Sequence, residues 1–377
     1  MKNIIPFNYQ SLTDADLKYF YKTLKSNHIS GNGIYTKKVE KLLENQLGIK
    51  KVLLTSSCTT ALDISSILID INEGDEIIIP SFTFVSTALS FYMRGAKIIF
   101  ADIRKDNLNI DERKLEKLIS KKTRAIVIVH YGGISCDIDY IKKIADSYNI
   151  TLIEDNAHGI FGKYKTKYLG SYGALSTLSF HETKNFTCGE GGALCINDEK
   201  LIERAQIIRE KGTNRSLFID GKVDKYNWID KGSNFLLSEL QASILFSQLQ
   251  SRKTIQLKRM KVWNYYYQGI KTWAYEKGVQ LPVFSKENTN AYHTFYLILK
   301  NEKIRDHFIK FLNKNNIRSV FHYQPLNNSP MVNNNQDSPQ RCPNSESLSG
   351  RIVRLPLFNK IKKSEYQKVV KSVIKYD

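Results

Sequence analysis

The segment Thr151-Leu152-Ile153-Glu154-Asp155-Asn156-Ala157-His158-Gly159 joins a short apolar run to a group of polar residues. An apolar run of this length, bounded by polar residues, is typical of a strand buried on both faces of a parallel sheet. Parallel α/β proteins build their sites beyond the carboxyl ends of such strands, so Asp155 stands where chemistry is expected. The alternatives for Asp155 are a helix cap and a structural ion pair.

Similar apolar runs recur on both sides of this segment and alternate with amphipathic stretches. They predict seven strands, at Lys51–Thr55, Glu76–Pro80, Lys97–Ala101, Ala125–His130, Thr151–Asp155, Leu175–Phe180 and Gly192–Ile196. The intervening stretches predict helices over Thr59–Ile71, Asp111–Lys122 and Asp137–Tyr148. We therefore expect an α/β fold with a mainly parallel seven-stranded sheet that helices cover on both faces.

The pattern changes after Ser238 and predicts a second, smaller unit. A long helix is expected from Glu239 to about Tyr267. A small α+β unit follows, with strands His293–Leu299 and Arg318–Tyr323 and helices Glu302–Asn313 and Ser364–Tyr376. The polar residues Asn327 to Ser349 predict a mobile loop or lid. We expect a large domain over residues 1–250 and a small domain over 251–377.

Composition and charge exclude several classes of protein. The 377 residues include 56 Lys and Arg against 37 Asp and Glu, a net charge of +19, but the basic residues are interleaved with acids. We therefore expect no nucleic-acid partner. The five cysteines form no C-x-x-C pair, which predicts a reduced, cytoplasmic chain without a zinc site. The longest uncharged stretch, Ile77–Met93, is too short and too polar to cross a bilayer, so no membrane insertion is expected.

A second candidate for chemistry lies beyond the sixth predicted strand. The sequence there is Ser179-Phe180-His181-Glu182-Thr183-Lys184-Asn185, followed by Cys188-Gly189-Glu190-Gly191-Gly192. A lysine at a strand end is often simply solvated. If Lys184 is partly desolvated, however, its pKa falls and its amine becomes a nucleophile that can form a Schiff base.

Two further strand ends carry groups suited to a flat, phosphorylated cofactor. Thr55-Ser56-Ser57-Cys58-Thr59-Thr60-Ala61 runs from a strand into a helix, whose first turn offers free amides and hydroxyls to an anion. An ordinary Ser/Thr-rich helix cap is the alternative. Phe82 and Phe84 follow the next strand, where one ring is placed to stack on a cofactor if neither belongs to the core.

Together, the phosphate cradle, aromatic ring, strand-end Asp155 and Lys184 are the groups needed to hold pyridoxal 5′-phosphate. In this interpretation the Asp155 carboxylate keeps the pyridine nitrogen protonated, and Lys184 carries a proton to and from the carbon next to the imine. The combination is more specific than any one of its parts.

Five motifs resemble those of the sugar-nucleotide aminotransferases of the DegT/DnrJ/StrS type, along essentially the whole chain. They are Pro80–Thr87, Glu154–Gly159, Ser179–Asn185, Gly189–Ala193 and Gly232-Ser233-Asn234 with Ser238-Glu239-Leu240-Gln241-Ala242. The resemblance implies a fold-type I PLP-dependent transferase, with Lys184 and Asp155 as the catalytic residues. It also implies a homodimer with shared active sites, because the asparagine matching Asn234 contacts the cofactor phosphate of the other subunit.

The same resemblance assigns the remaining cofactor contacts. It implies that Ser57, Cys58, Thr59 and Ser179 surround the phosphate, that Phe84 stacks on the ring with Phe82 in reserve, and that His158 contacts the phenolic oxygen. No metal ion is implied.

A closer resemblance, in Ile208–Ser216 and Val223–Tyr226, is to the branch that aminates TDP-4-keto-6-deoxy-D-glucose with L-glutamate. The product of that branch is TDP-4-amino-4,6-dideoxy-D-galactose, for surface polysaccharides such as the O-antigen of lipopolysaccharide. Substrate contacts are expected from Arg209, Lys211, Arg215, His322 and Tyr323, although the first three also suit a solvated helix end. Relatives commonly carry His where this chain has Asn327, which leaves sugar contacts there open.

Three rival functions are considered. The first is a sister aminotransferase that uses another keto sugar or gives the 4-amino-4,6-dideoxyglucose epimer, and the second is a PLP-binding regulator without activity. The third, a nucleotide-dependent oxidoreductase, lacks its G-x-G-x-x-G motif here.

Overall fold

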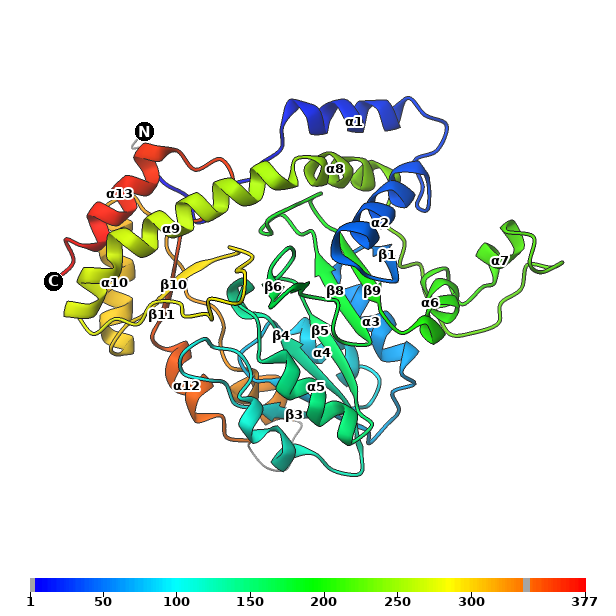
Figure 1. Ribbon diagram of the computed structural model, residues 1–377, viewed down its shortest axis with the longest axis horizontal. Helices are drawn as coiled ribbons and strands as arrows, with labels where there is room; N and C mark the ends of the chain where they lie inside the picture. The colour runs from blue at the N-terminus through cyan, green and yellow to red at the C-terminus, as the bar shows by residue number, and fades with distance from the viewer. Residues whose placement is uncertain (1–3, 335–339) are drawn as a thin grey trace.

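A seven-stranded sheet forms the centre of the larger part of the chain (Figure 1). The computed structural model describes residues 4–334 and 340–377. The strands are β1 (Lys51–Thr55), β2 (Glu76–Pro80), β3 (Lys97–Ala101), β4 (Thr123–Val129), β5 (Thr151–Asp155), β8 (Leu175–Ser179) and β9 (Gly192–Ile196). Each coincides with a predicted strand, and only the ends of β4 and β8 differ from the prediction, by one or two residues.

The sheet is mainly parallel, in the order β1-β9-β8-β5-β4-β2-β3. β9 is the exception, because it runs antiparallel to both of its neighbours, β1 and β8. Asp155 pairs with Val129 of β4 on one side and Thr177 of β8 on the other. The central strand therefore ends level with β4 and two residues before the end of β8, so the segments that follow these strands begin at one edge of the sheet.

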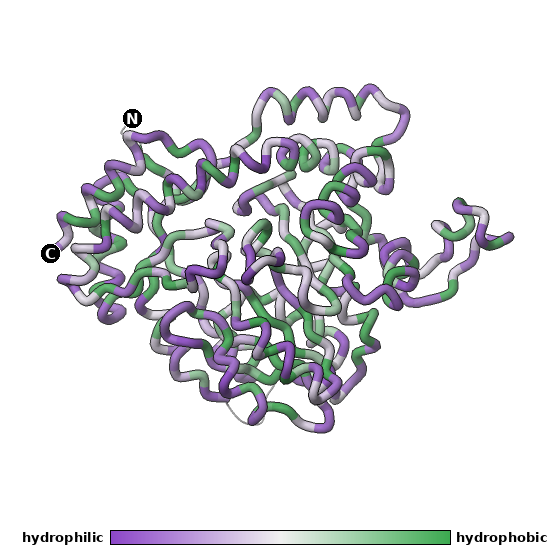
Figure 2. Tube along the Cα trace, viewed as in Figure 1, coloured by the Kyte–Doolittle hydropathy of each residue, from purple (hydrophilic) through white to green (hydrophobic). Residues whose placement is uncertain are grey.

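Helices cover both faces of the sheet because successive strand residues point to opposite sides. Ile77 and Ile79 pack in the core that includes α3, whereas Ile78 packs in the core that includes α5. Figure 2 shows apolar residues concentrated along these central strands. The covering helices are α2 (Ile34–Leu47), α3 (Cys58–Leu68), α4 (Ser86–Tyr92), α5 (Ile138–Ser147), α6 (Ile202–Arg209) and α8 (Glu239–Gln250).

One predicted helix of the larger part is wrong in type and length. The segment predicted as a helix over Asp111–Lys122 forms only the 3₁₀-helix η1 (Glu112–Leu118). Asp111 makes no side-chain cap to this segment, and its carboxylate instead accepts hydrogen bonds from the Arg113 guanidinium. Other short elements are β6 (Lys163–Tyr164), β7 (Lys167–Tyr168), η2 (Tyr131–Gly133) and η3 (Glu199–Leu201).

The long helix expected from Glu239 is in fact two helices. α8 ends at Gln250, and α9 (Arg252–Glu276) begins after Ser251, which leaves the helical conformation with ψ near 8°. Leu245 and Leu249 of α8 pack in the core of the sheet, whereas Trp263 and Tyr266 of α9 pack in a separate core. A division into domains at residues 250 and 251 remains our proposal.

The smaller part is an α+β unit built against α9. Strands β10 (Phe295–Ile298) and β11 (Ile352–Leu355) pair antiparallel, and helices α10 (Glu302–Lys314) and α13 (Lys363–Val373) pack with them. The predicted strand Arg318–Tyr323 is wrong. Arg318 bonds to Ile5 and Val320 bonds to Arg354, so the partner changes within two residues and no continuous ladder forms.

The mobile loop or lid expected over Asn327–Ser349 is not supported where the segment is described. Residues 335–339 lie outside the described part of the chain. Elsewhere the segment contains η4 (Leu326–Asn328), α11 (Pro330–Asn333) and α12 (Pro343–Ser349). Asn327 is fully buried, where it accepts a hydrogen bond from Ser81 Oγ and donates to the Gln340 carbonyl. Such contacts fasten this segment to the end of β2.

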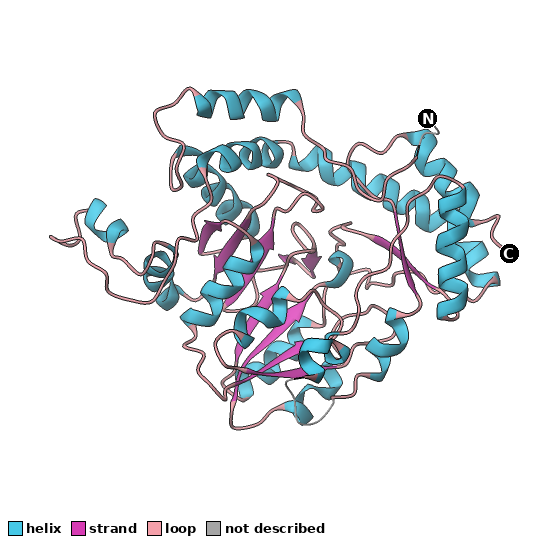
Figure 3. Ribbon diagram, turned by 180° about the vertical axis from the view of Figure 1, so that it is seen from behind, coloured by secondary structure: helices cyan, strands magenta, loops and turns pink. Residues whose placement is uncertain are grey.

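A helix-tipped arm projects from the body of the molecule, as Figures 1 and 3 both show. We define the arm as residues 213–231, which include α7 (Arg215–Ile219). The Asn214 amide donates to the Asn227 carbonyl and the Asn227 amide donates to Asn214 Oδ1, which holds the two limbs together, while Trp228 is 80% exposed. At the edge of the molecule, α1 (Asp14–Leu24) packs on α8.

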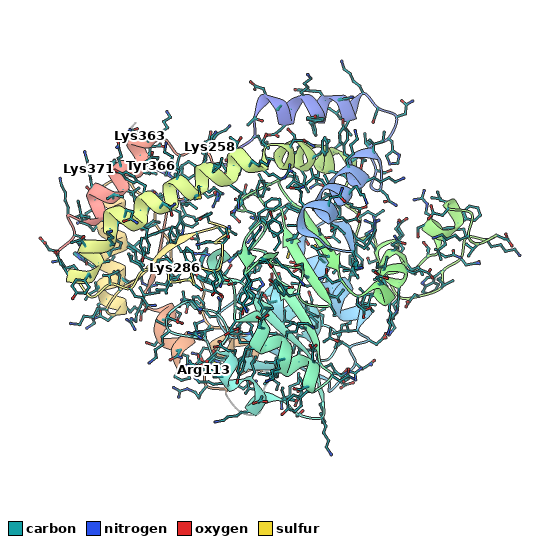
Figure 4. The ribbon with its side chains drawn as sticks, viewed as in Figure 1. Arg113, Lys258, Lys286, Lys363, Tyr366 and Lys371 are labelled. Atoms are coloured by element: carbon teal, nitrogen blue, oxygen red, sulfur yellow. The ribbon has the colours of Figure 1, made fainter. Side chains whose placement is uncertain are left out.

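The excess positive charge is spread over several elements. Figure 4 labels basic side chains on α9 (Lys258), on α13 (Lys363 and Lys371), on η1 (Arg113) and on a loop (Lys286). Within residues 4–334 and 340–377, no helix is both long and apolar enough to traverse a lipid bilayer.

Candidate active site

Strand ends of the large sheet and one edge of the smaller unit surround a single cavity of about 480 Å³. Nearly all of the expected cofactor-site residues line it: Ser57, Cys58, Thr59, Phe84, Asp155, His158, Ser179 and Lys184. His322 and Tyr323, expected to contact substrate, line it as well. The sequence therefore predicted groups that the structure brings together from five separate segments.

The Asp155 side chain is held at the end of β5 by two donors. Thr87 Oγ1 donates to Oδ2 at 2.7 Å, and the Ala157 amide donates to Oδ1 at 3.2 Å. Burial raises the pKa of the Asp155 carboxyl, while the Thr87 and Ala157 hydrogen bonds and the nearby Lys184 charge oppose that rise. Asp155 is thus oriented toward the cavity without a basic side chain as an ion-pair partner.

The neighbouring Glu154 has a structural role, because strand alternation turns it to the other face of the sheet. It is fully buried and accepts hydrogen bonds from His130 Nε2 at 2.9 Å and from the amides of Gly170, Tyr172 and Gly173. Burial alone would raise the pKa of Glu154, but these donors lower it. Of the two adjacent acids, only Asp155 reaches the cavity.

Lys184 enters the cavity from the turn after β8. Burial lowers the pKa of its amine to about 8, although the nearby Cys58 and Asp155 oppose this shift. The turn is fixed by its neighbour Asn185, whose Nδ2 donates to the Ala291 carbonyl and whose Oδ1 accepts from His293 Nδ1. A lysine amine with this pKa is partly neutral near pH 7 and is therefore nucleophilic.

The start of α3 forms a cradle for a phosphate group. Ser57 caps the helix through Thr60, and the first-turn residues Cys58 and Thr59 lie on the cavity wall with Ser179. A Cβ atom at Gly192 would lie 2.3 Å from the Cys58 nitrogen, so glycine is needed for β9 to pass beneath this turn. Helix amides and hydroxyls at one end of a cavity are suited to an anion.

Two aromatic residues after β2 have different environments. Phe84 is 54% exposed and lines the cavity, whereas Phe82 is 1% exposed and packs against the Tyr131 ring at 5.1 Å. Phe82, the reserve candidate for stacking, is therefore a core residue, and Phe84 is the ring available to a cofactor.

His158 is a buried, neutral donor. Its Nδ1 accepts a hydrogen bond from the Gly132 amide at 3.3 Å, so the ring proton lies on Nε2, which is 3.2 Å from the Tyr323 hydroxyl. Burial lowers the pKa of His158 well below its ordinary value, and the positive charges of Lys184 and Arg354 act in the same direction. Its ring stacks on His293 at 4.2 Å.

The expected substrate contact of Arg209 is wrong. The Arg209 guanidinium is 3% exposed and donates to Glu40 at 2.6 Å, to the Leu54 carbonyl and to Asn32. It therefore joins α2 to β1 and does not face the cavity.

Lys211, Arg215 and Asn234 are also absent from the cavity wall of their own chain. Asn234 is exposed and forms a bridge with Glu210 near the root of the arm. In the next helix, the Glu239 carboxylate accepts hydrogen bonds from the amides of Gly33, Tyr35 and Thr36, which anchors this root to the start of α2. The roles of Lys211, Arg215 and Asn234 remain predictions.

Sequence reasoning missed one residue that supports the site, Thr87, and two that line the cavity, His293 and Arg354. Thr87 lies within a motif that was recognised, but its hydrogen bond to Asp155 depends on the position of α4. His293 comes from the segment just before β10 and Arg354 from β11, a strand that was not predicted at all. Asn327, by contrast, does not line the cavity, and its amide forms buried hydrogen bonds with Ser81 and the Gln340 carbonyl.

With this geometry established, comparison with known proteins identifies the family. The sequence model of the DegT/DnrJ/EryC1/StrS aminotransferase family matches residues 10–374. The chain belongs to this family. Its pyridoxal 5′-phosphate cofactor and fold-type I architecture agree with the expectations from sequence.

The aminotransferase has full-length relatives of known sequence and structure. It is 32% identical over 372 residues to the uncharacterized protein MJ1066 of Methanocaldococcus jannaschii, covering 96% of this chain and 95% of the relative. It is 29% identical over 377 residues to GDP-perosamine synthase of Escherichia coli O157:H7, covering 98% and 97%. Among solved structures it resembles Helicobacter pylori PseC, an aminotransferase involved in the biosynthesis of pseudoaminic acid, at 25% identity and a TM-score of 0.89, covering 99% of both chains.

The residues of the cavity fit pyridoxal 5′-phosphate. The α3 cradle is suited to its phosphate, Phe84 to one face of its ring, Asp155 to its pyridine nitrogen and Lys184 to its aldehyde. When bound, the cofactor supplies an electron-accepting ring that takes the electron pair left by a departing proton.

Proposed function

We propose that the aminotransferase transfers the amino group of L-glutamate to C4 of TDP-4-keto-6-deoxy-D-glucose, giving TDP-4-amino-4,6-dideoxy-D-galactose. The observation that carries this proposal is the shared cavity of Lys184 and Asp155, which also contains His158, His322 and Tyr323. These last three side chains offer uncharged hydrogen-bonding groups, because burial lowers the pKa of both histidines and raises that of Tyr323 to about 12. Such groups suit the hydroxyls of a sugar.

The residues divide the chemistry between them. Lys184, as a partly neutral amine, takes the proton from the carbon next to the reacting nitrogen and returns it on the other side of the transfer. Asp155, fixed by Thr87 and Ala157, holds the pyridine nitrogen in its charged form. His158, whose Nε2 lies 3.2 Å from the Tyr323 hydroxyl, would hold the phenolic oxygen of the cofactor as a hydrogen-bond donor.

The main alternative substrate is a GDP-linked keto sugar. GDP-perosamine synthase, with 29% identity along the whole chain, favours this second candidate. A sister enzyme that forms the 4-amino-4,6-dideoxyglucose epimer is the third. The three differ in the nucleotide contacts and in the face of C4 that receives the proton, while the roles of Lys184 and Asp155 are the same.

We also propose a homodimer in which each arm completes the partner's site. Two observations support it: the arm exposes apolar side chains, including Phe218, Ile219 and Trp228, and Asn234 at its root faces away from its own cavity. In this arrangement Asn234 contacts the cofactor phosphate of the other subunit, and Lys211 and Arg215 contact the substrate diphosphate.

The decisive experiment is incubation of the cofactor-loaded protein with L-glutamate and, separately, TDP- or GDP-linked 4-keto-6-deoxy sugars. We expect amination of the TDP substrate and an axial C4 amine by NMR. An equatorial amine would instead support the 4-amino-4,6-dideoxyglucose epimer. A preference for the GDP substrate would support a GDP-linked keto sugar. A protein that binds cofactor but never consumes glutamate would be a regulator.

The setting of this activity follows from the proposal. Amino sugars of this kind would serve surface polysaccharides such as the O-antigen of lipopolysaccharide, and the expected location is the cytoplasm. Both remain predictions that rest on the identity of the product.

A further inference from the structure

Positive charge is concentrated in the smaller part of the chain. Residues 251–377 contain 23 Lys and Arg against 8 Asp and Glu, a net charge of +15. Residues 1–250 contain 33 Lys and Arg against 29 Asp and Glu, a net charge of only +4. Among the described residues, the cavity takes only Arg354 from the basic side chains of the smaller part. Most of the charge of this chain is therefore not explained by the active site.

The outer side of α9 carries a regular series of exposed side chains. The helix buries Val262, Tyr266 and Trp273 in the core of the smaller unit, and the residues that point the other way recur at helical spacing. Leu257 and Tyr275 are 59% and 89% exposed on this outer side. The exposed lysines of the helix are Lys253, Lys258, Lys261 and Lys271.

α13 lies beside α9 and widens this surface. The Tyr366 ring of α13 is 4.9 Å from the Tyr265 ring of α9, and a Cβ atom at Gly269 would lie 2.7 Å from Val370. On their outer side, α13 and the residues after it expose Lys363, Lys371, Ile374 and Lys375. We call the exposed outer side of these two helices, with the lysines and apolar residues just given, the basic face.

Acidic side chains do not neutralise the basic face. In the described chain none of its lysines lies within ion-pair distance of an acid, whereas the neighbouring Lys277 pairs with Asp377 at 3.7 Å. Glu365 of α13 accepts a hydrogen bond from the Lys362 amide at 2.7 Å and is directed toward the start of its own helix. The unpaired lysines therefore form a patch of one sign, which attracts anions.

The basic face is remote from the regions already assigned. None of its residues lines the cavity. Figure 4 labels Lys258, Lys363 and Lys371 on this outer side, away from the central sheet, and the arm lies at the opposite end of the molecule in Figures 1 and 3. Catalysis and the proposed contact between arms and partner sites therefore leave the basic face uncovered.

The kind of side chain on the basic face favours a lipid surface over other anions. Recognition of a single phosphate or carboxylate favours the paired donors of arginine, but Arg252 is bound to Gln46 and Arg259 to the Tyr292 carbonyl. Lysine amines are mobile charges that suit a layer of many phosphates. Leu257 and Ile374 gain little from a polar polyanion, but they are stabilised by entering the interfacial layer of a membrane.

We infer that the basic face docks this enzyme on an anionic phospholipid surface. Its lysines contact lipid phosphates, while Leu257, Tyr275 and Ile374 enter the layer between headgroups and acyl chains. The docking is peripheral, because no helix crosses the bilayer. It goes beyond the proposed function and does not depend on which nucleotide sugar is aminated.

The test is co-sedimentation of the cofactor-loaded protein with vesicles of phosphatidylcholine, either alone or mixed with phosphatidylglycerol. We expect binding to the mixed vesicles only, and it should weaken at least tenfold when NaCl is raised from about 0.1 M to about 0.5 M. One variant combines Lys258→Gln, Lys261→Gln, Lys271→Gln and Lys371→Gln. Its partition coefficient on mixed vesicles should fall at least about 50-fold, because each lysine near an anionic surface contributes about fivefold.

A matched control separates the basic face from net charge. It combines Lys117→Gln, Lys121→Gln, Lys122→Gln and Lys143→Gln, which remove the same charge from exposed positions of the larger part. These lysines lie far from the docked face, so binding should stay within about threefold of wild type. Both variants should unfold at the wild-type temperature because every altered side chain is exposed.

A second variant distinguishes a lipid surface from a soluble polyanion. Leu257→Ser combined with Ile374→Ser keeps all the lysines and removes apolar contact, so vesicle binding should weaken about tenfold. Binding to single-stranded oligo-dT, measured by fluorescence anisotropy, should be weak in the wild type and unchanged in this variant.

Four results would overturn the inference. The first is a wild type that does not prefer mixed vesicles to neutral ones. The second is a control variant that loses as much binding as the variant of the basic face, which would reduce the effect to net charge. The third is oligo-dT bound as tightly as mixed vesicles, which would make the basic face a nucleic-acid surface. The fourth is full vesicle binding without Leu257 and Ile374, because any polyanion would then suffice.

Discussion

The residues of the cavity and those of the arm differ in where they find their interaction partners. At the strand ends, the Asp155 carboxylate finds both of its donors, Thr87 and Ala157, within one chain. The arm exposes Trp228 to 80% and directs none of its residues into its own cavity. The contacts of the cavity can be explained within a single subunit. We propose that the arm, by contrast, functions only when it packs against a second subunit.

The comparison is tested most severely by Lys184→Ala. Because this change removes both the attachment point and the proton carrier, we expect turnover to fall by about 10⁴-fold or more, with thermal unfolding unchanged. Steady-state kinetics and circular dichroism measure the two. Lys286→Ala, on the exposed surface labelled in Figure 4, serves as the control and should behave as wild type. Substantial activity in Lys184→Ala would remove this residue from the mechanism.

Adjacent acids should give contrasting variants. Asp155→Asn cannot hold a charged pyridine nitrogen, so kcat should fall by about 10²- to 10³-fold in a stable protein. Glu154→Gln weakens a network of buried donors and should cost about 1–3 kcal/mol of unfolding free energy, with nearly normal kcat in the folded enzyme. Denaturant unfolding and kinetics distinguish the two, and exchanged phenotypes would contradict the orientation of β5.

The pKa of Lys184 predicts how cofactor attachment depends on pH. Only the neutral amine attacks the aldehyde, and a pKa of about 8 means that the neutral fraction falls as the pH drops below 8. Attachment to the apoprotein, followed by absorbance, should therefore slow about tenfold per pH unit below 8 and level off above it. A midpoint near 10.5, the ordinary value for lysine, would show that the amine is solvated.

Shared sites make two inactive variants able to rescue each other. Lys184→Ala and Asn234→Ala homodimers should both be impaired, but mixed dimers carry one site in which both residues are wild type. Unfolding and refolding an equimolar mixture should restore about a quarter of wild-type activity. If active protein sediments as a single chain, or if mixing restores nothing, the arm belongs to its own subunit.

The smallest change in activity is expected at one of two arginines that lie six residues apart. Arg215→Ala should raise KM for the nucleotide sugar about fivefold without a change in stability, because the exposed side chain is proposed to contact a diphosphate in the partner's site. Arg209→Ala breaks the buried pair with Glu40 and should lower the free energy of unfolding by about 3–5 kcal/mol. Arg209→Lys keeps the charge and should recover part of that loss. A KM effect confined to Arg209 variants would reverse the correction made above.

The sequence predicted the sheet and the cofactor groups because both depend on local patterns. A strand buried on both faces is a continuous apolar run, and the groups that follow it, such as Asp155, inherit their place from the sheet edge. Arg209 and Arg354 were not predicted correctly because burial of a guanidinium depends on distant partners. The ion pair with Glu40 determines the buried position of Arg209. The antiparallel pairing of β11 with β10 determines the position of Arg354.

Segments that change partner within a few residues were the other source of error. The stretch over residues 318–323 has strand-like composition but bonds first to Ile5 and then to Arg354. The residues around Asn327 look like a loop in sequence, yet a buried amide network fastens them to Ser81. Neither outcome follows from hydropathy or periodicity.

The arm also allows subunit assembly to be measured without any substrate. Its two limbs carry Lys222 and Lys225, both exposed in a single chain, and both peptide bonds that follow them are targets for trypsin. If a second subunit covers the arm, newly made chains would be vulnerable there only until they meet a partner. The rate of tryptic cleavage at these lysines would then measure how long newly made chains remain monomeric.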